Sequence, residues 1–215
     1  MITVETVYGP GRMVVAEARK PLGTLLLSHG AGNGIDTRDL EALAAALPSE
    51  GFSVVRFEQP WRVAGRKVAT APPTLDVGLK AAAAVLASGR SARHQPLIVG
   101  GRSAGARSAC RCAQDLGARG ALALAFPLHP PGKPEKSRKD ELSVGVPVLV
   151  VQGGNDPMGR PDAFPERTQI AVVPYADHGF KVPVRAPITQ AEALDLIVEA
   201  TLEWLVREIV GSGRE

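Results

Sequence analysis

The sequence has little of what marks a disulfide-bonded or membrane protein. Its 215 residues include two cysteines, Cys110 and Cys112, in a segment that we expect to be helical. Side chains at this spacing point in different directions, so the pair cannot form a disulfide. The first twenty residues mix charged and apolar side chains and lack the apolar stretch of a signal peptide. No other run approaches the length of a membrane span. We therefore expect a cytoplasmic protein with no membrane partner.

A strong excess of one charge is also missing. The 25 Lys and Arg residues stand against 22 Asp and Glu residues, and the two signs are interspersed along the chain. The one basic cluster, residues 133–139, contains Glu135 and is typical of a solvated loop. We therefore expect no nucleic-acid partner, and the sequence identifies no protein partner.

Short apolar runs are present in number, and they alternate with segments of helical spacing. This alternation is typical of a mostly parallel sheet with helices on both faces. Buried strands are predicted at residues 24–28, 52–57, 96–99, 121–126, 146–151 and 169–173, and an antiparallel edge hairpin at 2–7 and 13–16. Helices are predicted over 37–47 and 75–86, and a last one follows a capping box of Thr189 and Glu192 and ends near Gly211. We predict one domain over residues 1–215.

Between an apolar strand and a helix of small residues, the chain reads Gly101-Arg102-Ser103-Ala104-Gly105. A nucleophilic serine on a sharp strand-to-helix turn needs glycines two residues to either side, because the strand and helix approach closely there. The pattern itself arises by chance in roughly one such sequence in ten, so its placement carries the argument. We predict Ser103 as a nucleophile.

Only four histidines are available as its base. A serine hydroxyl is a weak nucleophile and needs a base, which in turn needs an orienting acid. His178 follows the last predicted strand and fits the chain order serine, acid, histidine used with such turns. His29 ends a central strand, His94 precedes a strand and so belongs to the opposite end of the sheet, and His129 follows the strand after Ser103. We predict His178 as the base.

The orienting acid is expected just beyond the strand at 146–151. Asp156 stands there in Asn-Asp-Pro after two glycines, which is also ordinary turn chemistry. We favour Asp156 as the acid because its position and the chain order agree. Asp177 adjoins the base and would diverge from it in direction, while Asp162 lies further past the strand. Both are weaker choices.

The negative charge of a tetrahedral intermediate needs preorganised donors. We predict the backbone N–H groups of Ala104, directly after the nucleophile, and of Ala31, in the glycine-dense loop at 28–34, with Gly32 as the fallback. The same glycines would also serve a tight strand-to-helix turn without catalysis. Trp61 and His129 are tentative substrate contacts, since each could equally be a packing residue. Arg102 is expected to form a structural ion pair beneath the site, near Arg56 or Glu58.

Four segments resemble the dienelactone-hydrolase-like α/β hydrolases: His-Gly-Ala-Gly, Gly-Arg-Ser-Ala-Gly, Asn-Asp-Pro and Asp-His-Gly-Phe. The resemblance covers nearly the whole chain. It implies an α/β-hydrolase fold without a large lid domain and a triad of Ser103, Asp156 and His178. Gly-Gly-Arg-Ser-Ala-Gly-Ala-Arg and Phe-Pro-Leu-His-Pro-Pro-Gly-Lys-Pro are most similar to a small branch that includes a regulatory subunit of the NSL histone-acetyltransferase complex. Unlike dienelactone hydrolases proper, the chain carries serine and not cysteine as nucleophile.

We therefore predict a serine hydrolase of the carboxylesterase type that acts on a small ester, lactone or thioester through an acyl-enzyme. This chemistry needs no cofactor and no metal, and we expect neither. The alternative is a binding or scaffold protein that keeps the hydrolase fold without catalysis. A dinucleotide-binding oxidoreductase is disfavoured, because residues 30–34 read Gly-x-Gly-x-Gly and not Gly-x-Gly-x-x-Gly.

Overall fold

Eight strands form one sheet in the computed structural model, which describes residues 1–89 and 95–211. The strand order is β1-β2-β4-β3-β5-β6-β7-β8. The first pairings, β1 with β2 and β2 with β4, are antiparallel, and all others are parallel. The strands are β1 (Ile2–Val4), β2 (Gly11–Ala16), β3 (Gly23–Ser28), β4 (Phe52–Glu58), β5 (Leu97–Arg102), β6 (Gly120–Leu124), β7 (Val148–Gly153) and β8 (Gln169–Val173). The predicted mostly parallel sheet with an antiparallel edge hairpin is confirmed.

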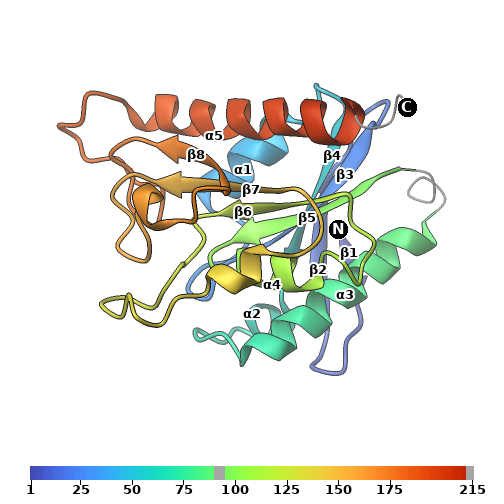
Figure 1. The fold of residues 1–215 in the computed structure, drawn as a ribbon. Coiled ribbons are helices and arrows are strands. Elements are labelled where there is room, and N and C mark those ends of the chain that lie inside the picture. The colour runs from blue at the N-terminus through green and yellow to red at the C-terminus, as the bar shows by residue number, and fades with distance from the viewer. Residues whose placement is uncertain (90–94, 212–215) are drawn as a thin grey trace.

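Helices cover both faces of the sheet (Figure 1). One face carries α1 and α5, which contact each other, and the opposite face carries α3 and α4, which also contact each other. The helices are α1 (Arg38–Ala46), α2 (Pro60–Val63), α3 (Pro72–Ser88), α4 (Ala104–Cys112) and α5 (Gln190–Trp204). The long helix α5 begins at the predicted capping box, in which the Thr189 hydroxyl accepts from Glu192 N–H and the Glu192 carboxylate accepts from Thr189 N–H.

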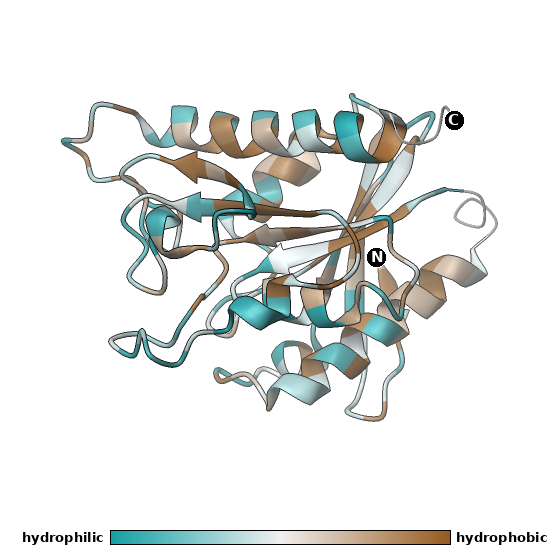
Figure 2. Ribbon diagram, viewed as in Figure 1, coloured by the Kyte–Doolittle hydropathy of each residue, from teal (hydrophilic) through white to brown (hydrophobic). Residues whose placement is uncertain are grey.

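The central strands are apolar over much of their length (Figure 2), and they pack into a core on each face of the sheet. Successive residues of β3 alternate between two cores: Leu25 and Leu27 pack under α1 and α5, while Leu26 packs under α3 and α4. All three leucines are fully buried, and each such side chain contributes about 1.5–3 kcal/mol to folding. Burial on both faces explains why the strands appear in the sequence as continuous apolar runs.

Strand β5 is longer than the predicted run at 96–99, and the difference matters for the site. Gly100 and Gly101 continue the strand to Arg102, directly before Ser103. A Cβ atom at Gly100 would lie 2.8 Å from the Leu122 carbonyl oxygen of β6, so the strand tolerates no side chain there. Close packing against the neighbouring strand therefore requires a glycine at position 100.

The carboxyl ends of the six parallel strands gather at one edge of the sheet, which is where open α/β sheets bind ligands. Cys110 and Cys112 are buried on α4 and form no disulfide with each other, as predicted. Within the ranges that the structure describes, no helix is long and apolar enough to cross a membrane.

Candidate active site

Ser103 lies between β5 and α4 in a conformation that few side chains adopt. Its φ of 54° and ψ of −113° fall outside the ordinary regions for a residue other than glycine. The turn brings the backbone against the end of β3, where a Cβ atom at Gly105 would lie 2.6 Å from the Ser28 carbonyl oxygen and one at Gly101 would collide with the same atom. The two glycines of the pattern are therefore required by packing, as the sequence predicts.

Three predicted residues come together at this turn. The Nε2 atom of His178 lies 2.9 Å from Ser103 Oγ, and its Nδ1 atom lies 2.7 Å from Asp156 Oδ2. Asp156 follows β7 and His178 follows β8, so three strand ends supply the three side chains. The other two acids point elsewhere: Asp177 accepts from the N–H groups of its own loop, and Asp162 is exposed.

The Asp156 carboxylate is fully buried and held by two further donors. Gln152 at the end of β7 donates its Nε2 to Oδ2 over 2.9 Å, and the backbone N–H of Met158 donates to Oδ1 over 2.8 Å. With His178, the carboxylate therefore accepts three hydrogen bonds, which offset the cost of burying a charge. Nothing in the sequence singles out Gln152, because one polar residue near the end of an apolar strand is not by itself a signal of function.

The other histidines have different surroundings. His29 is buried, and its Nε2 accepts from the backbone N–H of Gln59 over 3.0 Å, so Nδ1 carries the proton and donates to the Gly30 carbonyl oxygen over 2.8 Å. Burial lowers the pKa of His29 below its usual value. The Nδ1 atom of His129 lies 2.9 Å from the Pro130 carbonyl oxygen. His94 lies outside the described residues.

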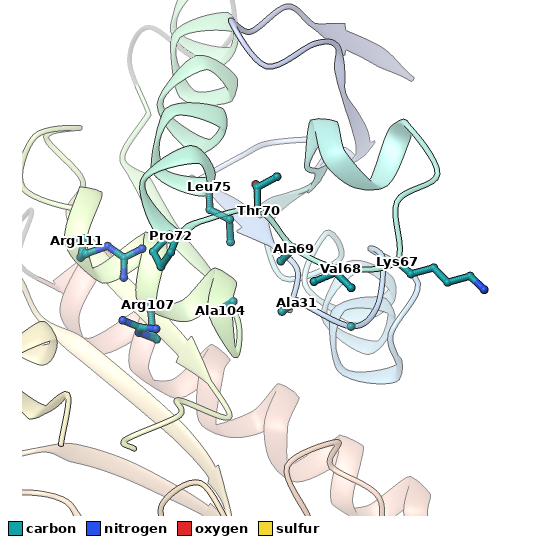
Figure 3. A pocket seen from close by; sticks show the side chains of 11 residues that line it. Ala31, Lys67, Val68, Ala69, Thr70, Pro72, Leu75, Ala104, Arg107 and Arg111 are labelled. Carbon is teal, nitrogen blue, oxygen red and sulfur yellow. The ribbon is translucent and has the colours of Figure 1, made fainter. Parts of the chain in front are cut away.

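A cavity of about 460 Å³ lies beside Ala31 and Ala104, the two residues predicted to supply oxyanion donors. The N–H of Ala104 is the first of α4 and has no acceptor within its own helix. The lining residues are Ala31, Gly32, Lys67, Val68, Ala69, Thr70, Pro72, Leu75, Ala104, Arg107 and Arg111. Figure 3 shows Ala104 between the arginines on one side and Ala31, Val68 and Ala69 on the other. Both predicted donor positions therefore face one cavity.

The arginine wall of this cavity is held by ion pairs that the sequence does not reveal. Arg107 binds Glu141 through Nε (2.8 Å) and Nη2 (2.5 Å). Arg111 binds Asp76 through Nε (2.9 Å) and Nη2 (2.7 Å), and it also reaches Glu141. Asp76 belongs to α3 and Glu141 to the connection before β7. Because both guanidinium groups are paired in this way, the wall has a fixed shape.

The two tentative substrate contacts do not line this cavity. Trp61 on α2 is buried, and its ring packs against that of His29 with centroids 5.3 Å apart. It borders a separate cavity with Tyr8 and Thr74. His129 lies half-buried after β6, where its backbone N–H donates to the Met158 carbonyl oxygen. A role in binding substrate stays a prediction for both residues, because neither residue lines this cavity.

The ion-pair partner of Arg102 differs from the expected one. Its Nε lies 3.3 Å from Asp39 Oδ2 on the first turn of α1. Glu58 pairs instead with Arg12 of β2, and Arg56 pairs with Glu41. Helix α1 follows β3, which pairs with β5, so the first turn of α1 starts near Arg102 at the end of β5. The expected partners, Arg56 and Glu58, lie on strand β4, whereas the observed partner, Asp39, lies on helix α1.

Comparison with known proteins places the chain in a family. A model of the α/β-hydrolase domain matches residues 21–206, and the chain belongs to this family.

Among solved structures, it is similar to an α/β serine hydrolase without lid from Xanthomonas campestris, with 21% identity, a TM-score of 0.70 and coverage of 94% and 93% of the two chains. It is also similar to a dienelactone hydrolase from Anabaena variabilis, with 18% identity, a TM-score of 0.73 and coverage of 97% and 96%. These two likenesses concern the fold.

A curated relative from Mycobacterium tuberculosis, which bears a provisional phosphoribosyl transferase name, is 26% identical over 227 residues. The match covers 98% of this chain and 47% of that protein, so the chain spans about half the length of the curated relatives it matches.

Proposed function

We propose that this α/β hydrolase is a serine hydrolase of the carboxylesterase type, which cleaves a small ester, lactone or thioester through a covalent acyl-enzyme. Ser103 is the nucleophile, His178 the general base and acid, and Asp156 the residue that orients the imidazole. The hydrogen-bonded series from Asp156 through His178 to Ser103 Oγ carries the proposal, because it joins a base and an orienting acid to a serine in a strained turn.

In the first half of the reaction, Ser103 Oγ attacks the carbonyl carbon while His178 Nε2 accepts the hydroxyl proton. The electron pair of the carbonyl moves to its oxygen, and the N–H groups of Ala31 and Ala104 stabilise that negative charge. Collapse of the tetrahedral intermediate expels the alcohol or thiol, which takes the proton from His178. The acyl group stays on Ser103.

Water completes the cycle by the same route. His178 Nε2 accepts a proton from the attacking water, a second tetrahedral intermediate forms, and its collapse returns the proton to Ser103 Oγ and releases the acid. Throughout, the Asp156 carboxylate stabilises the protonated imidazole, and its hydrogen bonds from Gln152 and Met158 keep it in place.

The acyl group fits the cavity beside the two oxyanion donors. Val68 and Ala69 lie opposite the arginines, and Leu75 of α3 also lines the cavity; these side chains suit the apolar part of an acyl chain. At about 460 Å³, the cavity lies at the lower end of the range for small-molecule sites, which supports a small substrate.

Labelling with a fluorophosphonate, followed by intact-protein mass, tests the nucleophile. We expect one adduct on the native chain and on Ser49→Ala, whose serine is exposed and far from the site in sequence, and none on folded Ser103→Ala. A burst of acyl-enzyme formation with 4-nitrophenyl esters would accompany the label. Turnover that survives Ser103→Ala would overturn the mechanism.

The alternative is a binding or scaffold protein that keeps the fold without catalysis. Absence of both label and ester turnover on a well-folded native chain would favour it. The phosphoribosyl transferase name belongs to a relative about twice as long, and the residues described above give that chemistry no support. A cytoplasmic location and similarity to the branch with the NSL-complex subunit stay predictions.

A further inference from the structure

The Arg102 side chain connects the loop of the proposed base to helix α1. Its Nη2 donates to the backbone carbonyl oxygen of His178 over 2.8 Å, and its Nε lies 3.3 Å from Asp39 Oδ2. Arg102 is 6% exposed and Asp39 is fully buried. The hydrogen bond to His178 fixes the direction of the guanidinium group, and the contact with Asp39 is an ion pair without hydrogen-bond geometry.

The charges of Arg102 and Asp39 stabilise each other electrostatically. Burial raises the pKa of the Asp39 carboxyl, and the positive charge of Arg102 opposes that shift. Each group thus supplies the counter-charge that the other needs in a site with little access to water. Removing either one alone leaves a buried charge without compensation.

The guanidinium also leaves little room for a side chain at one glycine in each of the two proposed working loops. The position of a Cβ atom at Gly30, in the oxyanion loop, lies 3.4 Å from Arg102 Nη1, and that at Gly179 lies 3.6 Å from Nη2. Gly179 directly follows His178. One side chain therefore borders the loop of the proposed base and the loop of a proposed oxyanion donor.

The loop that carries His178 is strained at both ends. Tyr175 and Phe180 have φ values of 62° and 52°, which side chains other than glycine rarely adopt. A loop in such a conformation persists only when its surroundings fix it. The bond from Arg102 is such a restraint, because it holds the carbonyl of the very residue whose imidazole contacts Ser103.

We propose that Arg102, fixed by Asp39, is a positioning residue that sets the distance between the His178 imidazole and Ser103 Oγ. This inference rests on the proposed function for its effect on turnover, although the restraint on the loop is independent of it. A displacement of about 1 Å at reacting groups costs roughly 100-fold in rate. We therefore expect Arg102→Ala to lower kcat by about 10- to 100-fold and to change KM by less than about threefold, because the acyl cavity is untouched.

Arg56→Ala is the matched control. Arg56 also donates to a backbone carbonyl, that of Ile35 over 2.9 Å, and also pairs with an α1 carboxylate, Glu41 at 3.6 Å. Neither of these two interactions involves His178. We expect kcat of the control to stay within about threefold of native. Equal losses in the two variants would overturn the proposal.

Added guanidinium separates positioning from general damage. Arg102 borders a cleft of about 480 Å³ with Asn33, Asp177, Gly179 and Lys181, through which a small cation can reach the space left by truncation. Millimolar guanidinium chloride should restore kcat of Arg102→Ala several-fold, whereas equal potassium chloride should not. No rescue, together with a KM that rises as kcat falls, would contradict the proposal.

Two further measurements cover a variant that fails to fold or a chain without turnover. Asp39→Asn/Arg102→Leu removes both charges at once and should fold, yet keep the low kcat, because the His178 carbonyl still lacks its donor. Hydrogen exchange over residues 174–181 should rise in the Arg102 variants and not in Arg56→Ala, whether or not esters are hydrolysed. Unchanged exchange there would refute the restraint, whereas increased exchange in a chain without native turnover would refute only the proposed function.

Discussion

Two histidines at the same edge of the sheet, His29 and His178, are used in opposite ways. His29 follows β3 and is closed in on both ring nitrogens, by the Gly30 carbonyl oxygen and the Gln59 N–H. The His178 side chain follows β8 and remains 22% exposed, with one nitrogen on a carboxylate and the other on a hydroxyl. The ring nitrogens of His29 are bonded to backbone groups, which do not take up or release protons near neutral pH, whereas those of His178 join a carboxylate and a hydroxyl, which can.

The partners of an imidazole, more than its place in the fold, therefore decide what it can do. The neutral His29 ring, hydrogen-bonded to a backbone donor and a backbone acceptor, holds the ends of β3 and β4 together. A ring that bridges a carboxylate and a hydroxyl can accept a proton and keep it, because the carboxylate stabilises the resulting charge. The predictions below separate these two roles.

The largest effect is expected at His178. His178→Ala removes the proposed base, and we expect kcat for 4-nitrophenyl acetate to fall by roughly 10⁵-fold. The melting temperature should fall only slightly, because the ring is partly exposed and the buried Asp156 carboxylate keeps its hydrogen bonds from Gln152 and Met158. Steady-state kinetics and a thermal melt check both parts. A loss in kcat below about tenfold would mean that His178 has a structural role like that of His29.

A smaller effect is expected from Asp156→Asn, which keeps the shape of the orienting group and removes its charge. The amide can present a donor to Nδ1 and so favour the wrong ring tautomer, and we expect a loss in kcat of about 10⁴-fold. Ser103→Ala, combined with Asp156→Asn, should lose hardly more than Ser103→Ala alone, since the residues act as a unit. Independent, multiplying effects would count against a joint mechanism.

The smallest effect on turnover, and the largest on stability, is expected from His29→Leu. It leaves the Gly30 carbonyl oxygen and the Gln59 N–H without their partner, at a cost of about 2–4 kcal/mol in the free energy of unfolding. Below the melting temperature, kcat should fall by less than about tenfold. Urea denaturation and ester kinetics measure the two quantities, and a kcat loss as large as that of His178→Ala would remove the distinction.

The pH dependence of stability tests the structural role of His29 separately from catalysis. Because the folded pKa of His29 is lowered from its usual 6.5, the unfolded chain binds a proton first as the pH falls. The native free energy of unfolding should therefore decrease below about pH 6.5, until the folded pKa is reached, and be unaffected by this group above it. Urea melts between pH 5 and 8 should lose this component in His29→Leu, and an identical pH profile would contradict it.

The sequence predicts the sheet well because each central strand is buried on both faces and so forms a continuous apolar run. It predicts the Ser103 turn from local chain geometry, and Asp156 and His178 from their places after successive strands in the chain order of the fold. It does not predict the pairing of Arg102 with Asp39, or of Arg107 and Arg111 with Glu141 and Asp76, since ion pairs between separate elements leave no periodic signal. The single domain over residues 1–215 stays a prediction.

The strained turn at Ser103 places stability and chemistry in opposition. A φ of 54° costs a serine about 1–3 kcal/mol, and an alanine there bears the same strain. Glycine adopts this conformation freely, and even after its greater chain entropy in the unfolded state, Ser103→Gly should be more stable than Ser103→Ala. Two variants that both lack the nucleophile would thus differ in their melting temperatures. The difference measures the conformational strain that the fold tolerates to present one hydroxyl group.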